Sequence, residues 1–375
     1  MAGMRRVHAL NFIRTMAVTT VAFLAPLRFL ELGFDGAGIG VVVALFASAP
    51  MVFSFPTGWL NDRVSMKAVM GAALLAMAAP FGAIGFIRGV APMAAAFLLL
   101  GVANNAFNVS INSLYFKDRA ETDPNRKYGR YVGWLSLGPP AGLLIGSFVA
   151  RVAGFRTLLG VMAVLCLAAA AAVHGLGEER FAAVSIRDYR FSVFNKRTLL
   201  FSAFLVLVAL HWGTELTVYG PFLRTRLGLS DSGVALYMAG AYLALASAAF
   251  LVGRLKFDPV RNRRLLLAGM TLSGLGLILM TVGDVRLSFL FRFLHEGGDG
   301  LTGAFVILTM SRLFEKATIG GSAGILMALQ TTGHMAGSLL FSWLGFRAGL
   351  QVPMIVAGAI LLANAAFGLY ALPRE

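Results

Sequence analysis

The 375-residue sequence contains little charge and almost no cysteine. Charged residues make up 13% of the chain and hydrophobic residues 58%, and the mean hydropathy is +0.79. A soluble domain of this length needs more charge to cover its surface, so a soluble globular protein is excluded. The single cysteine, Cys166, cannot form a disulfide within the chain. It lies in an Ala- and Leu-rich segment, where a thiol packs as a small apolar group.

Long apolar runs recur along the whole chain. Many can cross a hydrocarbon core of about 30 Å as helices of about 20 residues. Because backbone polar groups in lipid must be paired within their own segment, we expect these runs to be helical. The predicted fold is an all-α membrane protein with twelve transmembrane helices, over residues 8–31, 36–56, 68–87, 92–115, 129–150, 155–175, 199–223, 232–253, 264–282, 286–311, 322–343 and 350–371.

The basic residues mark one side of this membrane topology. The net charge is +15, but the basic residues lie in short loops rather than on one face or tail, which argues against nucleic-acid binding. If the N-terminus is inside, most of them, including every lysine, fall in inside loops. This excess of basic residues in the inside loops predicts a multi-pass protein of the inner (plasma) membrane with both termini cytoplasmic. No cleavable signal peptide is expected, because Arg14 interrupts the first apolar run.

Glycines reveal an internal repeat. Gly58 and Gly253 occupy matching short loops and are 195 residues apart. The same offset pairs six further glycines, namely Gly33 with Gly228, Gly38 with Gly233, Gly129 with Gly324, Gly138 with Gly333, Gly142 with Gly337, and Gly154 with Gly349. Roughly two or three such coincidences are expected by chance. The repeat predicts two parallel six-helix bundles related by pseudo-twofold symmetry, over 1–176 and 198–375, joined by a cytoplasmic linker over 177–197.

The loop after the second predicted helix carries a family signature. It reads Gly58-Trp-Leu60-Asn-Asp62-Arg63-Val-Ser65-Met66-Lys67 and resembles the Gly-x-Leu-x-Asp-Arg/Lys-x-Gly-Arg/Lys-Arg/Lys loop of the major facilitator superfamily, from which Ser65 and Met66 depart. The resemblance implies a secondary transporter that works by alternating access. It also implies that the acid meets a helix terminus and the basic residues to hold the inside gate closed. The predicted gating-loop residues are Gly58, Asp62, Arg63 and Lys67.

Other segments support this resemblance in part. The second copy of the loop, from Gly253 to Asp258, is degenerate, with its acid one place late. The stretch from Gly138 to Gly142 resembles a Gly-Pro-x-x-Gly motif of antiporters, which favours export. The arginine usual in the fourth helix of the family is replaced by Phe97. The match therefore indicates the superfamily but not the substrate, and the direction of transport stays open.

Ionisable residues inside the predicted helices concentrate in the second half. His211 and Glu215 are four residues apart in the seventh helix. The tenth helix contains four more, whose spacing places them on one face of the helix, namely Arg292, His295, Glu296 and Asp299. Because such groups are costly in a bilayer, we expect a functional role. Glu215 and Asp299 are the predicted proton carriers, releasing a proton when water or Arg292 approaches, with His211, His295 and Glu296 as modulators.

A second, mostly neutral set is predicted to bind the solute. Its members are Asn11, Arg14, Asn105, Asn108, Asn112, Gln330 and His334. They could contact a polar or anionic solute across a central cavity. The competing interpretation is that they only form hydrogen bonds between helices.

Alternatives to proton coupling remain open at this level. The charged residues could form a purely structural network. They could also bind a divalent transition metal as transported cargo, or the protein could be an uncoupled facilitator. An enzyme is not expected, since no nucleophile or metal-hydrolase motif accompanies these residues. The expected partners are a small-molecule substrate, protons and the lipid bilayer, with no cofactor, no resident metal and a monomeric state.

Overall fold

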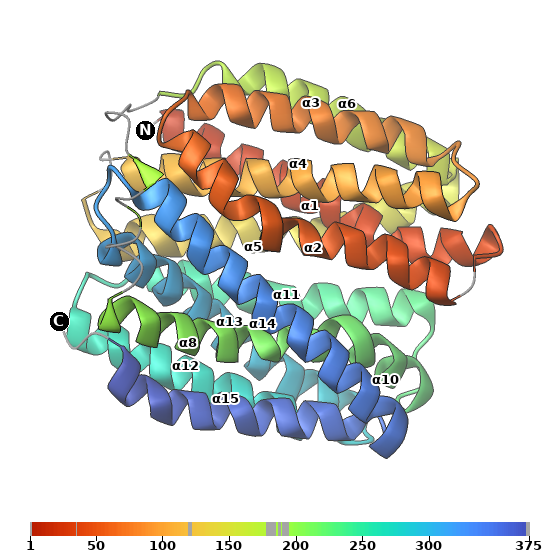
Figure 1. Ribbon diagram of the computed structural model, residues 1–375. Helices are drawn as coiled ribbons and strands as arrows, with labels where there is room; N and C mark the ends of the chain where they lie inside the picture. The colour runs from red at the N-terminus through yellow and green to blue at the C-terminus, as the bar shows by residue number, and fades with distance from the viewer. Residues whose placement is uncertain are drawn as a thin grey trace. The chain divides into compact units, whose positions relative to one another are not determined.

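The structure is a computed structural model that describes residues 2–34, 36–118, 122–177, 185–186, 189 and 195–372. The regular structure of this part is helical (Figure 1). Its first-half elements are α1 (Ala2–Glu31), α2 (Gly36–Asn61), α3 (Met66–Ile84), α4 (Val90–Lys117), α5 (Pro124–Ala153) and α6 (Phe155–Val173). Its second-half elements are α8 (Lys196–Leu210), α9 (Trp212–Thr214), the π-helix η1 (Glu215–Tyr219), α10 (Gly220–Thr225), α11 (Asp231–Val252), α12 (Pro259–Leu279), α13 (Val285–Leu313), α14 (Ile319–Ala348) and α15 (Gln351–Ala371).

α8, α9, η1 and α10 follow one another along one apolar stretch and together form a single membrane span. Counted in this way, the elements form the predicted twelve transmembrane helices. By length and composition alone, 8 helices of the described chain are apolar enough to cross a membrane. α13 is not among them, since Arg292, His295, Glu296 and Asp299 lower the hydropathy of its middle. α13 can still cross the membrane, because its charged groups are buried against neighbouring helices and do not face lipid.

The seventh helix, predicted over 199–223, spans residues 196–225 but is not regular throughout. Regular α-helix ends at Leu210, and a π-turn begins at Glu215. Pro221 explains the change of geometry, because its nitrogen cannot donate to the carbonyl one turn earlier and its ring displaces that carbonyl. A π-turn widens the helix locally and is frequent at functional sites.

The internal repeat is visible in the backbone. α5 spans residues 124 to 153 and α14 spans residues 319 to 348, the same length at the offset of 195. Among the described residues, four have positive φ, all of them glycines: Gly33, Gly154, Gly228 and Gly349. They form two pairs at the same offset, each ending a helix or starting the next. Positive φ is accessible to glycine at low cost, so the matched glycines fix matched turns.

By its packing, the described chain separates into two compact units. Unit 1 comprises Met1–Ala120, Leu137–Arg190 and Phe314–Ala328, and unit 2 comprises Glu121–Ser136, Phe191–Leu313 and Leu329–Glu375. The start of α5 therefore packs in unit 2, and the start of α14 packs in unit 1. The predicted bundle boundaries at 176 and 198 remain a prediction, and most of the proposed linker over 177–197 lies outside the described residues.

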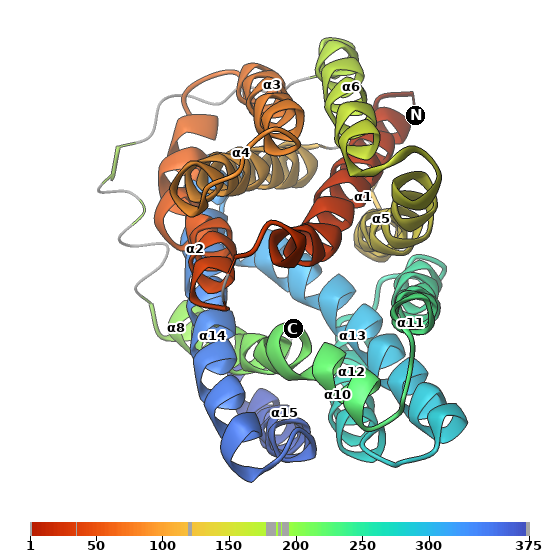
Figure 2. The ribbon, with the colours of Figure 1, turned by 90° about the vertical axis from the view of Figure 1, so that its right-hand side faces the viewer.

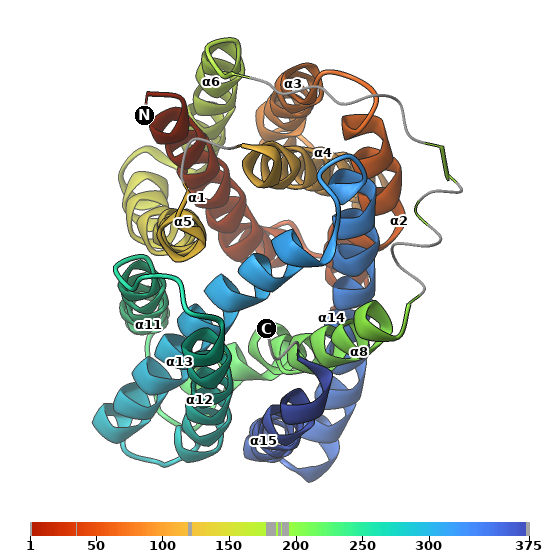
Figure 3. The same cartoon turned by 90° about the vertical axis from the view of Figure 1, so that its left-hand side faces the viewer.

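Helix neighbours repeat from one unit to the other. In unit 1, α4 packs against α2 and α3, and α6 packs against α3 and α1 (Figure 2). In unit 2, α13 packs against α11 and α12, and α15 packs against α12 and α8 (Figure 3). Each contact of the first set has its counterpart in the second at the offset of 195. The fold is thus the predicted pair of six-helix repeats.

Candidate functional site

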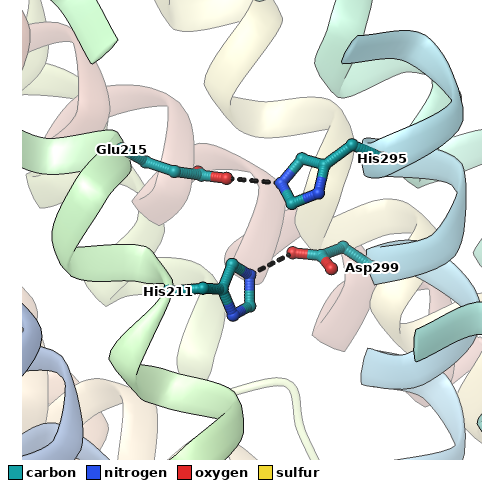
Figure 4. A group of neighbouring side chains, drawn as sticks. All are labelled: His211, Glu215, His295 and Asp299. Carbon is teal, nitrogen blue, oxygen red and sulfur yellow. Dashed lines mark hydrogen bonds and ion pairs between the residues drawn. The ribbon is translucent and has the colours of Figure 1, made fainter. Parts of the chain in front are cut away.

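The charged residues of the second half meet in unit 2. They come from the broken seventh helix and from α13, and Ser273 of α12 adds a hydroxyl group between them. Figure 4 shows His211 and Glu215 pointing toward His295 and Asp299 of α13. The sequence prediction placed these side chains on two helix faces, and the structure brings the two faces together.

Arg292 is the cation at the centre of this network, and its side chain is fully buried. Its Nη1 donates to Oε1 of Glu215 at 2.8 Å, and its Nη2 donates to Glu296 one turn along α13. The guanidinium also lies 4.4 Å from the ring centroid of Tyr219. Two carboxylates and an aromatic face thus offset the cost of burying the charge.

His295 and Glu215 form the first histidine–carboxylate pair. His295 Nδ1 lies 2.8 Å from the carbonyl oxygen of Ser273, so this nitrogen carries a hydrogen and donates. Its Nε2 lies 2.7 Å from Oε1 of Glu215. Two bare acceptors would repel one another at that distance. The contact therefore holds one further proton, either on the imidazole or on the carboxyl group.

His211 and Asp299 repeat this arrangement one turn away. His211 Nδ1 faces the carbonyl of Val208, and its Nε2 lies 2.9 Å from Oδ2 of Asp299. The other oxygen of Asp299 accepts from Oγ of Ser273 at 2.6 Å. Ser273 also contacts His295 Nδ1 at 3.0 Å, so it links the two pairs. By the same reasoning, this second pair also holds one exchangeable proton.

Solvent access differs among the members of the network. The side chains of Arg292, His295, Glu296 and His211 are at most 2% exposed, whereas Glu215 is 17% and Asp299 is 13% exposed. The groups that an incoming molecule can reach are therefore the two carboxylates. The fixed cation lies behind them.

The same four side chains could also hold a metal ion. His211, Glu215, His295 and Asp299 each offer one ligand atom, and these atoms lie within 4.8 Å of one another. Two imidazoles and two carboxylates suit a divalent transition metal. Arg292 counts against such a site, because its positive charge already occupies the same oxygen of Glu215 that faces His295.

Unit 1 contains a smaller polar group around Arg14. Its guanidinium donates to Oδ1 of Asn11 at 3.0 and 3.2 Å and to Oδ1 of Asn104 at 2.8 Å. Asn105, which the sequence analysis chose, points elsewhere and accepts from Ser54 at 2.9 Å. The residue that reaches Arg14 is therefore its neighbour Asn104.

The remaining predicted solute-binding residues are dispersed. Asn108 is half-buried on α4, and Nδ2 of Asn112 lies 3.9 Å from Sδ of Met327. Gln330 and His334 are half-buried on α14 in unit 2, where the His334 ring lies 6.1 Å from that of Trp212. The structure joins Asn11 with Arg14. That the whole set lines one cavity stays a prediction.

The loop that was predicted to gate forms a compact cluster of contacts within unit 1, which we call the latch. The side chain of Asp62 is fully buried and accepts from the backbone N–H groups of Gly320 and Gly321 at 3.3 and 2.9 Å, at the N-terminus of α14. This is the helix terminus that the family resemblance implied, and it favours a negative charge. A Cβ at Gly320 would come 2.6 Å from Oδ1 of Asp62, so the close approach requires glycine. Gly58 packs against the same turn.

The latch uses two residues that the sequence analysis missed. Nζ of Lys117, at the end of α4, lies 2.7 Å from Oδ1 of Asp62, and Oη of Tyr189 donates to Oδ2 at 2.9 Å. Arg63 instead stacks 4.2 Å over the ring of Trp59, and Lys67 is half-buried at the start of α3. The basic partner of the acid is thus Lys117 rather than either basic residue of the motif.

A duplicated six-helix repeat with a latch loop and a buried charge network is the architecture of a secondary transporter. A family model described as the Major Facilitator Superfamily matches residues 7–263 and 206–375. The chain belongs to this superfamily.

Two curated relatives and one solved structure illustrate the similarity. The chain is 27% identical over 365 residues to the multi-drug resistance efflux pump PmrA of Streptococcus pneumoniae serotype 4 (strain ATCC BAA-334 / TIGR4), covering 90% of this chain and 89% of the relative. The PmrA protein of strain ATCC BAA-255 / R6 gives the same values. The crystal structure of the human organic anion transporter MFSD10 (TETRAN) superposes with a TM-score of 0.81 at 14% identity, covering 97% and 99% of the two chains. This last likeness concerns the fold alone.

Proposed function

We propose that this protein is a proton-coupled exporter of small organic solutes, with cations favoured. The observation that carries the proposal is the presence of two histidine–carboxylate pairs on α13 and the broken seventh helix, each arranged around one exchangeable proton. A purely structural network needs only fixed ion pairs. Here two protons are held at sites whose carboxylates reach solvent.

The coupling step is a competition for Glu215 and Asp299. With protons in place, each pair is a neutral acid facing an imidazole or an ion pair of zero net charge. An approaching cation interacts more strongly with the free carboxylates, and the protons leave to water. When the cation departs on the other side, protons return. The carboxylates hold either protons or the cation but not both. Movement of the solute is therefore tied to movement of protons in the opposite direction.

The latch supplies the gate for alternating access. Asp62, Lys117 and Tyr189 hold the start of α14 against the end of α2, on the face assigned to the cytoplasm. Opening that face breaks these bonds. An inner-membrane location with both termini in the cytoplasm agrees with the distribution of the basic residues.

Export is favoured by two observations. The Gly138–Gly142 stretch resembles the antiporter motif, and the PmrA relatives bear the name of a multidrug efflux pump. The preference for cations rests on exposure, since the accessible charges of the network are carboxylates and its arginine is buried. A monomer suffices for this function.

Proteoliposomes that enclose a pH-sensitive dye test the proposal. Cationic drugs, organic anions, sugars and amino acids are added under an imposed proton gradient to wild type and to the Glu215→Gln and Asp299→Asn variants. We expect cation-evoked proton movement that falls at least 100-fold in both variants. Thr20→Val is the matched control, because Thr20 occupies the position of Glu215 in the first repeat. Unchanged transport in both acid variants would mean that the network is structural and the protein an uncoupled facilitator.

The four-residue cluster supports a second candidate, transport of a divalent transition metal. Wild-type protein would then be stabilised against heat by zinc, nickel or cobalt ions, and the stabilisation would disappear in His211→Asn and His295→Asn. Its absence at millimolar metal would rule this candidate out. Proton movement evoked by metal and not by organic cations would favour it over the exporter.

A further inference from the structure

A cleft at one end of unit 2 carries three arginines. It is open to solvent, has a volume of about 50 Å³ and is lined by Arg197, Pro259, Asn262, Arg263, Leu266, Phe305, Thr309, Arg312 and Leu372. These residues come from the start of α8, the start of α12, the end of α13 and the residue that follows α15. The starts of α8 and α12 and the end of α15 lie at the same end of the unit (Figure 1). No carboxylate lines the cleft within the part of the chain that the structure describes.

Within the described residues, no acid pairs with these three guanidinium groups. None of Arg197, Arg263 and Arg312 forms an ion pair with another described residue. Arg263 donates from Nη2 to the carbonyl of Leu369, and its buried Nε has no partner in the described chain. Arg197 and Arg312 are exposed. The cleft therefore gathers three guanidinium groups that have no acidic partner in the described part of the chain.

The internal repeat explains why the described residues of the cleft include no acid. In the first half, Lys117 at the end of α4 is paired with Asp62 at 2.7 Å. The residues 195 positions later are Arg312 and Phe257, and Arg312 stacks 4.7 Å over the Phe257 ring. The second repeat thus keeps the cation and replaces its acid with an aromatic ring. A cation–π contact leaves the guanidinium hydrogens free to bind an external anion.

We propose that this cleft binds the phosphate group of an anionic phospholipid. Arginine forks match phosphate oxygens in a bidentate manner, and Asn262 and Thr309 offer further polar atoms. Leu266, Phe305 and Leu372 form an apolar floor that suits the glycerol and the first acyl carbons. The cleft lies where helices begin and end, which is the level of lipid headgroups, on the face that the basic residues assign to the cytoplasm. Basic pockets between helices on that face attract anionic headgroups.

The position of the cleft links it to the charge network through the helices. α8 leads from Arg197 toward His211, α12 leads from Arg263 to Ser273, and α13 joins Arg312 to Asp299. A bound phosphate draws the ends of these three helices together. The site is separate from the coupling residues, so lipid binding and proton coupling can be measured independently.

Binding is tested on the purified full-length chain in an uncharged detergent. Dioctanoyl phosphatidylglycerol, dioctanoyl phosphatidylcholine and glycerol 3-phosphate are titrated separately, and affinity is measured by native mass spectrometry and by the rise of the unfolding midpoint. We expect phosphatidylglycerol to bind at least tenfold more tightly than phosphatidylcholine, whose ammonium group cancels the phosphate charge. Glycerol 3-phosphate, which lacks acyl chains, is expected to bind at least tenfold more weakly than phosphatidylglycerol.

The R197Q/R263Q/R312Q variant should lose at least tenfold in affinity for phosphatidylglycerol. The matched control R254Q/R264Q removes exposed arginines outside the cleft and should stay within twofold of wild type. If the triple Gln variant does not fold, R197K/R263K/R312K keeps the charge, removes the fork and should lose about threefold to tenfold. Equal affinity in wild type and the triple variant would overturn the site. Equal affinity for glycerol 3-phosphate and phosphatidylglycerol would retain the phosphate chemistry but overturn the lipid as its source.

Discussion

The two halves of this transporter share one backbone plan and differ in the chemistry of equivalent positions. Each member of the charge network has a counterpart 195 residues earlier that carries no charge. The pairs are Met16 and His211, Thr20 and Glu215, Phe97 and Arg292, Leu100 and His295, Gly101 and Glu296, and Asn104 and Asp299. The first half instead has a buried Arg14, whose guanidinium donates to the neutral amides of Asn11 and Asn104.

This contrast separates what the fold needs from what the function needs. Neutral residues at all six positions still support the helix neighbours seen in unit 1, so ionised groups are not required for packing. Burying them in unit 2 costs several kcal/mol per ion unless they are paired. The asymmetry is consistent with the proposed proton coupling, which places its ionisable groups in the second half.

The two loop regions differ in a similar way. In the first, the acid is on the loop, and Asp62 accepts from N–H groups at the start of α14. In the second, the acid precedes α5, and Asp123 accepts from the N–H of Phe257 on the loop at 3.2 Å. Asp258, which follows it, caps α12 by accepting from Arg261 at 2.9 Å. The displaced acid noted in the degenerate loop is thus a helix cap.

The largest expected difference between the halves is in stability. Arg292→Met leaves Glu215 and Glu296 buried without their cation and should lower the free energy of unfolding by about 3–5 kcal/mol. Arg14→Met removes hydrogen bonds to neutral amides and should lower it by about 1–3 kcal/mol. Thermal and denaturant unfolding of both variants in detergent measures the difference. Equal losses would show that the network of unit 2 is no more interdependent than the group around Arg14.

The next difference concerns the two loops. Asp62→Asn removes the charge that binds Lys117 and two N–H groups, and should lower the free energy of opening the latch by about 1.5–3 kcal/mol. In a Cys166→Ala background, a cysteine at the buried Ser322 reports opening of the latch by its labelling rate. We expect a rise of about tenfold to 100-fold.

Asp123→Asn provides the matched test of the second loop. The Asn side chain keeps one acceptor oxygen, so the free energy of opening this loop should fall by only about 0.5–1.5 kcal/mol. A cysteine at the buried Val252 should then be labelled less than about tenfold faster. A larger rise at Val252 than at Ser322 would reverse the proposed ranking of the two loops.

Tyr189→Phe isolates one bond of the latch. The ring, which packs 5.7 Å from that of Phe55, is retained and only the donor to Asp62 is lost. The cost of about 1 kcal/mol should raise labelling of the Ser322 cysteine about fivefold. No change would mean that Lys117 and the α14 N-terminus hold Asp62 by themselves.

The smallest expected effect is a change in proton number. His211→Asn removes one of the two histidine–carboxylate pairs and should reduce the protons moved per solute from two to one. Met16→Leu, at the equivalent position of the first half, should leave the ratio unchanged. The ratio is obtained from the membrane potential at which net transport stops. An unchanged ratio in His211→Asn would assign coupling to the pair of His295 and Glu215 alone.

Sequence alone identified the membrane class, the twelve helices, the repeat and the residues of the charge network. These features are encoded locally, in apolar runs of helical length, in glycines at a constant offset and in rare ionisable groups within apolar segments. The acid of the latch was also identified, because its motif is contiguous.

Tertiary structure decided which of these residues meet. Lys117 and Tyr189 reach Asp62 across 55 and 127 residues of sequence, and no local pattern marks them. Asn104 and Asn105 are adjacent, but helical geometry turns them about 100° apart, so only one can face Arg14. Glu215, at the start of the π-turn, bridges Arg292 and His295, and the spacing of these residues in the sequence does not show that they meet. Side-chain partners depend on helix packing and local backbone geometry, which spacing in the sequence does not specify.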